Sequence, residues 1–245
     1  MKIILGKKIA MTQRYGADGQ VVPVTIVEAG PCFITQVKTA AEDGYQAIQI
    51  GYGQKKKTNK PLSGHLKSLK ARHIKELKLD KEDEVAYKVG EKIEVSIFNK
   101  GEKVKVRGTT KGRGFQGVVK RHGFHGAPKT HGTKDQLRHS GSVGAKGVAH
   151  TFKGTKMGGR MGGEQATIKN LEIIEIEPEK NLLYIKGAIP GSRNSLVEIY
   201  APGEMKIEAI PTSKVSEPAE EVASKVAAKV EVTEAKTENK EEVKV

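Results

Sequence analysis

Runs in which apolar and polar residues alternate, or in which β-branched residues cluster, recur along the first 110 residues and again after residue 165. This period of two, bounded by turn residues such as Gly30 and Pro31, is the pattern of half-buried strands. It predicts strands over residues 2–13, 21–28, 33–39, 47–52, 93–98, 103–107, 166–177, 182–186 and 196–200. The turn residues Asn99, Lys100 and Gly101 predict a hairpin between the fifth and sixth of these strands.

One segment has a helical period instead. Leu62, Leu66 and Leu69 fall on one face of a helix, which predicts a short amphipathic helix over residues 62–71. Many short strands at this spacing indicate a mainly β fold, either a small barrel or a sandwich. We expect one discontinuous β domain, residues 1–110 and 166–211, that carries residues 111–165 as a long irregular insertion. A connection of that length within a compact domain is normally functional or disordered.

Composition narrows the class of protein. The 245 residues are 36% apolar, include a single cysteine, Cys32, and carry a formal net charge of +14. No segment fits a membrane span or a signal peptide, and one cysteine excludes an internal disulfide framework. We therefore expect a soluble, basic, intracellular protein. Residues 212–245, rich in Ala, Glu, Lys and Val, are expected to form a disordered tail, and a docked helix is the alternative.

The positive charge is concentrated in the insertion. Residues 111–165 hold 11 Lys and Arg against 2 Asp and Glu, together with 14 of the 28 glycines and 5 of the 7 histidines. Only 13 of these 55 residues are apolar, too few to offset the conformational entropy of ordering the backbone. The composition predicts a cationic segment that needs an anionic scaffold to order it.

The sharpest motif in the insertion is glycine-rich. Gly112, Gly114 and Gly117 match the spacing G-x-G-x-x-G. A dinucleotide site would also need flanking strands, a helix and a well-placed acid, and a kinase would need H-R-D and D-F-G motifs. These contexts are missing, so we favour close approach of the glycine backbone to phosphates that nearby cations neutralise. A nucleotide-binding enzyme and a flexible solvated loop are the alternatives.

Other chemistries have less support. His122 and His125 have a spacing that metal ligands use, but adjacent glycines break the helix that would aim them, and no cysteine lies nearby. Ser140 and Ser142 lie near His139 without a G-x-S-x-G elbow. We predict no catalytic residue, no metal site and no cofactor. Three phenylalanines either stack on bases or anchor small apolar clusters, and both roles stay open: Phe115, Phe124 and Phe152.

Cationic and imidazole side chains are the predicted RNA contacts, because they neutralise phosphates, stack on bases and hydrogen-bond to 2′-hydroxyl groups. In the insertion these are Lys111, Arg113, Lys120, Arg121, His122, His125, Lys129, His131, Lys134, Arg138, His139, Lys146, His150, Lys153, Lys156 and Arg160. Two further clusters are Lys7 with Lys8, and Lys55, Lys56 and Lys57 with Lys60. A solvated face is the alternative for such lysine runs. A module for anionic membranes would need a large apolar helix face, which a glycine-rich segment lacks.

Several strings resemble one known family. Residues 1–13, 108–121, 138–144, 156–162 and 181–191 are similar, in this order, to the bacterial form of the third protein of the large ribosomal subunit, the L-three family. The resemblance covers about residues 1–210. It implies a translation-factor-like β-barrel on the subunit surface beside neighbouring ribosomal proteins. It also implies a cytoplasmic location in the ribosome and no enzymatic activity.

The resemblance implies a specific role for the insertion as well. Family members bind large-subunit (23S) ribosomal RNA directly near its 3′ end and help nucleate subunit assembly. Their central extension, here residues 111–163 with its tip near residues 144–152, runs toward the peptidyl transferase centre and supports it. The tip lacks the glutamine that some members methylate, which argues against that modification here. Ala10, Tyr15 and Lys105 also differ from the family's usual residues.

Overall fold

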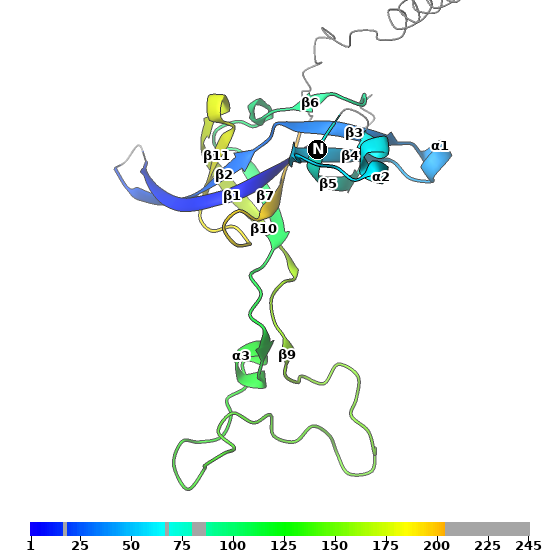
Figure 1. The fold of residues 1–245 in the computed structure, drawn as a ribbon. Coiled ribbons are helices and arrows are strands. Elements are labelled where there is room, and N and C mark those ends of the chain that lie inside the picture. Colours follow the sequence, from blue (N-terminus) through cyan, green and yellow to red (C-terminus); the bar gives the residue numbers. More distant parts are fainter. Residues whose placement is uncertain (17–18, 67–68, 80–86, 204–245) are drawn as a thin grey trace, which may run out of the picture. The chain divides into compact units, whose positions relative to one another are not determined.

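Six antiparallel strands, three from before the insertion and three from after it, close into a barrel (Figure 1). The computed structural model describes residues 1–16, 19–66, 69–79 and 87–203. Around the barrel the strand order is β1-β12-β7-β10-β11-β2. The strands are β1 Lys2–Tyr15, β2 Val21–Ala29, β7 Lys103–Thr109, β10 Gln165–Glu177, β11 Leu182–Lys186 and β12 Leu196–Ala201. The predicted mainly β fold with a small barrel is confirmed.

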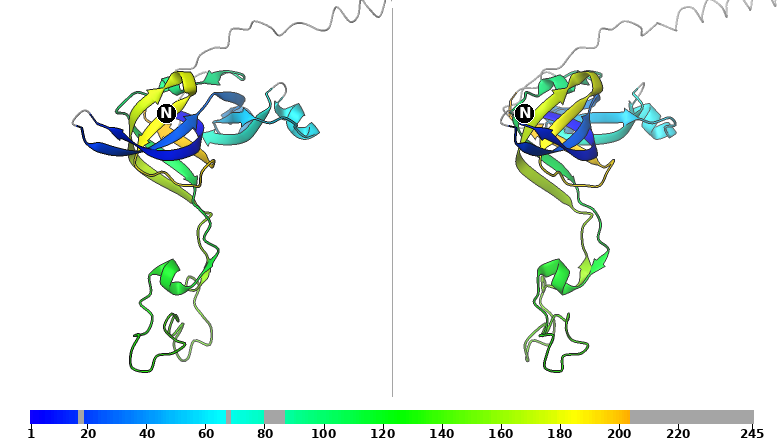
Figure 2. Two further views of the ribbon diagram at one scale, coloured as in Figure 1. Left: turned by 60° about the vertical axis from the view of Figure 1, so that its left-hand side comes forward. Right: turned by 90° about the vertical axis from the view of Figure 1, so that its left-hand side faces the viewer.

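A second sheet is formed by the residues between β2 and β7. Its strand order is β5-β4-β3-β6, with β3 Cys32–Lys38, β4 Ala47–Gln54, β5 Ala71–Lys78 and β6 Lys92–Ile93. The short helix α1 (Ala40–Asp43) joins β3 to β4, and α2 (Lys60–Leu66) lies between β4 and β5. Both views in Figure 2 show this sheet beside the barrel.

One hydrophobic core joins the barrel to the second sheet. Ile3, Ile4 and Leu5 of β1 are all fully buried, although successive residues of a strand point to opposite faces. Both faces of this part of β1 are therefore covered. Ile199 from the barrel and Ile50 from the second sheet belong to the same buried cluster. Burial of each such side chain contributes about 1.5–3 kcal/mol to folding.

Three local expectations differ from the structure. The strand expected over residues 93–98 is wrong: β6 ends at Ile93, and the 3-10 turn η1 (Val95–Ile97) buries Val95 and Ile97 in the core. The expected helix forms as α2 but ends at Leu66, and Ala71 already opens β5, a strand that the pattern did not predict. The turn after Asn99 is present, but it joins η1 to β7 rather than two paired strands.

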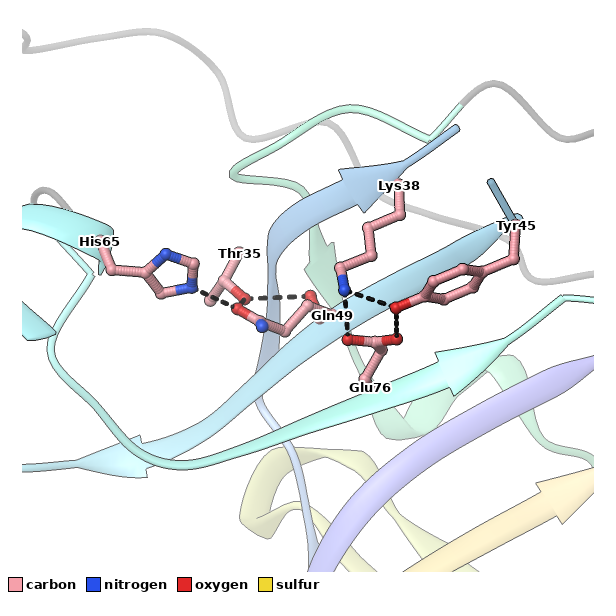
Figure 3. Close-up of polar contacts among 6 residues, drawn as sticks. All are labelled: Thr35, Lys38, Tyr45, Gln49, His65 and Glu76. Carbon is pink, nitrogen blue, oxygen red and sulfur yellow. Dashed lines mark hydrogen bonds and ion pairs between the residues drawn. The ribbon is translucent and has the colours of Figure 1, made fainter. Parts of the chain in front are cut away.

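Polar side chains cross-link one face of the second sheet (Figure 3). Lys38 Nζ on β3 donates to the Tyr45 hydroxyl at 2.6 Å and lies 2.8 Å from Glu76 Oε2 on β5. The Tyr45 hydroxyl donates to Glu76 Oε1 at 2.6 Å. These hydrogen bonds raise the pKa of Lys38 and lower that of Glu76. His65 Nε2 lies 2.8 Å from Gln49 Oε1, which attaches α2 to β4.

The long insertion connects two neighbouring strands of the barrel. Thr109 at the end of β7 pairs with Gln165 at the start of β10, and the intervening chain leaves from this edge (Figure 1). The tail expected over residues 212–245 lies outside the described residues. Among the helices that the structure describes, none is long and apolar enough to cross a membrane.

Candidate nucleic-acid interface

The insertion begins and ends as a paired stem, which we define as residues 110–116 and 159–164. Thr110 N–H donates to Glu164 O at 2.8 Å, and Arg113 N–H donates to Met161 O at 2.9 Å. Farther along, β8 (Phe115–Gln116) pairs with β9 (Gly159–Arg160). Backbone hydrogen bonds therefore continue from the β7–β10 pair of the barrel into the stem. The stem has no hydrophobic core of its own.

Glycine serves two different purposes in this region. Gly162 has a φ of +74°, and a Cβ there would collide with the carbonyl oxygen of Lys111 on the opposite side of the stem. By contrast, a Cβ at Gly112 or Gly117 would meet nothing within 4 Å. The chain's own packing thus explains Gly162, but it leaves open space beside two glycines of the G-x-G-x-x-G motif.

The context of that motif does not fit a dinucleotide site. Gly117 precedes α3 (Val118–His122), a helix of five residues, and the strand before it, β8, has only two. A dinucleotide fingerprint needs a buried strand that leads into a longer helix, with the helix packed on a parallel sheet. The barrel is antiparallel instead.

The remaining residues of the insertion, 117–158, form what we call the head. Arg121 Nη1 donates to Met157 O at 2.9 Å, and His122 Nε2 lies 3.0 Å from the same carbonyl oxygen. Ala127 N–H donates to Leu137 O at 3.1 Å. These few contacts connect α3 and the turn after it to the returning chain. Val118 is the only buried residue in the stem and head, all of whose residues the structure describes.

A cavity of about 540 Å³ opens in the head between the turn after α3 and residues 136–141. A second cavity of about 490 Å³ shares Gln136, His139, Ser140 and Gly141 with it. The side chains and backbone that line the first cavity belong to His122, Gly123, Phe124, His125, Gly126, Ala127, Gln136, His139, Ser140, Gly141 and Lys156.

The cations of the stem and head have no carboxylate partner among the residues that the structure describes. Within the described part of the chain, none of the 11 Lys and Arg of residues 111–165 lies within ion-pair distance of a carboxylate. All the RNA contacts predicted in the insertion are exposed, except His122, which is partly buried. Their charge is therefore available to an external anion.

The structure brings one of the two other predicted clusters to the stem. Lys8 Nζ donates to Ile189 O at 2.8 Å and to Gly191 O at 3.2 Å, and partial burial followed by the charge of Lys111 lowers its pKa. Lys8 therefore lies at the base of the stem and also holds a barrel loop, while its neighbour Lys7 is partly buried. Lys55, Lys56, Lys57 and Lys60 are exposed at the α2 end of the second sheet, away from the stem and head.

Two exposed aromatic rings accompany the charges. The side chains of Phe115 and Phe152 are 80% and 57% exposed, and the ring of His150 meets that of Phe152 edge-on at 5.5 Å. Phe124 is partly buried, with its ring centroid 6.2 Å from that of His122. Two of the three phenylalanines thus present faces to solvent.

Sequence reasoning did not find two further candidates. Gln136 lines both cavities, but a neutral amide outside any motif gives no signal in the sequence. Arg193 is exposed in a loop that approaches the end of β7, where a Cβ at Gly191 would lie 3.2 Å from Thr109 O. Only the fold places that loop at the base of the stem.

Comparison with known proteins gives consistent matches. The sequence model of the family described as ribosomal protein L3 matches residues 70–181. The large ribosomal subunit protein uL3 of Carboxydothermus hydrogenoformans is 51% identical over 203 residues, which are 81% of this chain and 96% of that protein. The uL3 proteins of Roseiflexus sp. (49% over 201 residues, 80% and 95%) and Chlorobium phaeobacteroides (50% over 204 residues, 81% and 98%) are similar to the same extent.

Proposed function

This chain belongs to the ribosomal protein L3 family and is a structural component of the large ribosomal subunit, and from that premise we propose that its stem and head bind large-subunit ribosomal RNA directly. The family consists of structural ribosomal proteins of the cytoplasm and not of enzymes, in agreement with the expectation from the sequence. One observation carries the proposal: the exposed cations of the stem and head have no carboxylate partner in the described part of the chain.

RNA is the anion that suits this distribution of charge. A protein that neutralises several phosphates releases their counterions, and this release provides most of the sequence-independent affinity. The cations lie along both sides of the stem and around the head, for example Arg113, Lys134 and Lys153. A linear polyanion that follows the extension contacts many of them at once, whereas a small anion contacts only a few.

Glycine and aromatic residues support the same ligand. The open space beside Gly112 and Gly117 lets a phosphate approach the backbone closely. The exposed rings of Phe115 and Phe152 offer faces on which unpaired bases stack, an interaction of about 1–3 kcal/mol per base. Side-chain positions at the base of the stem, such as Lys8 and Arg193, extend the contact toward the barrel.

We further propose a place for each part in the subunit. The stem and head bind the large RNA near its 3′ end, and the head approaches and supports the peptidyl transferase centre. The barrel, which shares one hydrophobic core with the second sheet, stays at the subunit surface, where it contacts neighbouring ribosomal proteins. Early binding by an extension that orders on RNA lets the protein nucleate subunit assembly.

A charge-matched pair of variants tests the RNA-binding proposal. The first variant replaces Arg113, Lys120 and Lys134 of the stem and head by alanine. The control replaces three exposed lysines outside them, Lys88, Lys100 and Lys103. Both lose the same charge. We expect only the first to reduce the slope of log K against log salt, by about 3, for binding to large-subunit RNA.

The same pair separates RNA contact from folding. The first variant should enter large subunits poorly, as measured by co-sedimentation through a high-salt gradient, and should melt like the unchanged protein. Equal loss of RNA binding in both variants would mean that net charge, and not the extension, decides affinity. A large fall in the melting temperature of the first variant would show that these residues stabilise the fold and are not RNA contacts.

A further inference from the structure

We infer that the head holds a pocket for an unpaired RNA nucleotide, whose base enters the 540 Å³ cavity lined by His122, Phe124, His125 and His139. The inference rests on the proposed RNA binding and adds the class of ligand, a single unstacked nucleotide rather than a duplex. The cavity volume lies within the range of about 300–1,000 Å³ that small-molecule sites occupy.

Backbone contacts join the two walls of the cavity. Ala127 N–H donates to Leu137 O at 3.1 Å, and a Cβ at Gly126 would collide with that same carbonyl oxygen. On the second wall, His139 N–H donates to Gln136 O at 3.2 Å and closes a turn. The glycine at position 126 is therefore required for the close approach that forms the pocket.

A hydrogen bond to the returning chain orients the imidazole of His122. His122 Nε2 lies 3.0 Å from Met157 O, and a carbonyl oxygen only accepts hydrogen bonds. Nε2 must then carry a proton and donate it to this oxygen, which fixes the orientation of the ring. The ring also packs against Phe124, at 6.2 Å between centroids. His122 thus combines an oriented ring nitrogen, Nδ1, with an aromatic surface.

The chemistry of the lining suits a base and its phosphate. Three imidazoles and a phenyl ring provide stacking surfaces, while Gln136 and Ser140 provide both donors and acceptors. Lys156 adds a positive charge, and no carboxylate lines the cavity. Within the described residues, no group of three or more His, Cys, Asp and Glu side chains could hold a metal ion.

The neighbouring cavity provides room for the next nucleotide of the strand. It shares Gln136, His139 and Ser140 with the first cavity, and Arg138 lines it as well. A strand that crosses this shared wall places one base in each cavity and its linking phosphate near Arg138. In a duplex, both faces of a base are stacked on neighbouring bases and one edge is paired. Only an unpaired segment of RNA can therefore place a base in the cavity.

Asparagine variants test the pocket. His125→Asn with His139→Asn removes two rings from the cavity and keeps polar groups in place. The control is His65→Asn, an exposed histidine on α2, outside the stem, the head and both cavities. The readouts are affinity for large-subunit RNA and chemical probing of its unpaired bases, with hydroxyl-radical probing of the backbone.

The unchanged protein should shield one or two unpaired bases from the base-reactive probe. The double variant should expose these bases and bind about 5- to 150-fold more weakly, the loss that base stacking accounts for. Its backbone footprint and salt slope should stay as in the unchanged protein, and His65→Asn should bind RNA as the unchanged protein does.

The outcomes separate this inference from the proposed function. If the protein binds RNA with a steep salt slope but shields no unpaired base, the pocket is wrong and RNA binding by the extension stands. The pocket is also wrong if the double variant matches the unchanged protein, or if His65→Asn loses as much affinity. If the unchanged protein does not bind the RNA, both proposals fail.

Discussion

In the barrel and the second sheet, several basic side chains form ion pairs with carboxylates. Lys2 Nζ lies 3.1 Å from Glu102 Oε1. Lys75 Nζ of the second sheet lies 3.3 Å from Oε1 of the buried Glu198. Residues 111–165 contain 11 basic side chains, and none of them has such a partner in the described part of the chain. The first region thus pairs part of its positive charge within the fold, and the second leaves its positive charge to a ligand.

The same two regions differ in what they bury. The barrel and second sheet share a core of fully buried residues such as Ile4, Ile50 and Ile199. In the stem and head, Val118 alone is buried, and backbone hydrogen bonds connect the rest. The comparison indicates that the folding free energy and the RNA affinity come from separate parts of this chain. Substitutions in one part should therefore change one of these two quantities and leave the other nearly unchanged.

The largest expected effect is that of salt on RNA binding. If the extension contacts about 6–10 phosphates, affinity for large-subunit RNA falls about 10³- to 10⁵-fold between 50 and 200 mM salt. Filter binding over a salt series measures the slope. The melting temperature of the free protein should change little over that range, because its stability rests on the core. If the affinity hardly changed with salt concentration, the cations of the stem and head would not be the phosphate contacts.

The next effect is on stability. Ile199→Ala in the barrel should lower the free energy of unfolding by about 2–5 kcal/mol, since it leaves a cavity in a fully buried site. Val118→Ala, which truncates the buried side chain of the head, should leave global unfolding almost unchanged. Urea denaturation compares the two. A similar loss in both variants would show that the head belongs to the cooperative unit of the barrel.

A smaller and local effect is expected in the stem. Gly162→Ala places a Cβ against Lys111 O at a positive φ, a strain of about 1–3 kcal/mol. The stem pairing should open, so that the amides of Arg113 and Met161 exchange faster with solvent. Gly112→Ala, whose Cβ meets open space, is the control and should leave this exchange unchanged. Amide exchange followed by NMR distinguishes the two variants.

The smallest expected effect concerns one carboxylate of the barrel. A hydrogen bond from the Tyr184 hydroxyl at 2.7 Å, followed by the charges of Lys180 and Arg14, lowers the pKa of Glu177. A lowered folded-state pKa stabilises the protein above the ordinary carboxyl pKa, and this contribution is lost as pH falls through the folded value. Tyr184→Phe should raise the pKa of Glu177, as followed by carboxyl NMR.

The stability difference between Tyr184→Phe and the unchanged protein gives a second readout. It should be present at neutral pH and shrink as the carboxylate becomes protonated in acid. A difference that stays constant down to low pH would assign the effect to packing of the tyrosine ring and not to its hydroxyl group.

Local pattern predicted most of the barrel but not the second sheet as a separate layer. β11 spans residues 182–186 as expected, because its apolar residues are bounded by clear turns. In β5, Ala71, Ile74 and Leu77 recur every three residues among charged side chains, a spacing closer to a helix than to a strand. Between Ile93 and Phe98 the apolar residues alternate like a strand, yet a tight turn buries them.

The candidate interface was predictable in composition and not in geometry. Charge density singled out the cations and imidazoles of residues 111–165, and their exposure agrees with that interpretation. Their contact with RNA stays a prediction. The hydrogen bonds of Lys8 to Ile189 and Gly191 bridge more than 180 residues, so only the closed barrel places Lys8 there. The cavity that Gln136 lines also depends on chain segments that no local pattern relates.

Hydrogen exchange of the full chain, measured with and without large-subunit RNA, tests the division between the two regions most directly. Without RNA, we expect slow exchange in the barrel strands and exchange at least about 10³-fold faster across residues 117–158, which lack a core. With RNA, residues 111–163 should become protected while the barrel changes little. Slow exchange of the head in RNA-free protein would contradict the account, because the extension would then be ordered by its own contacts.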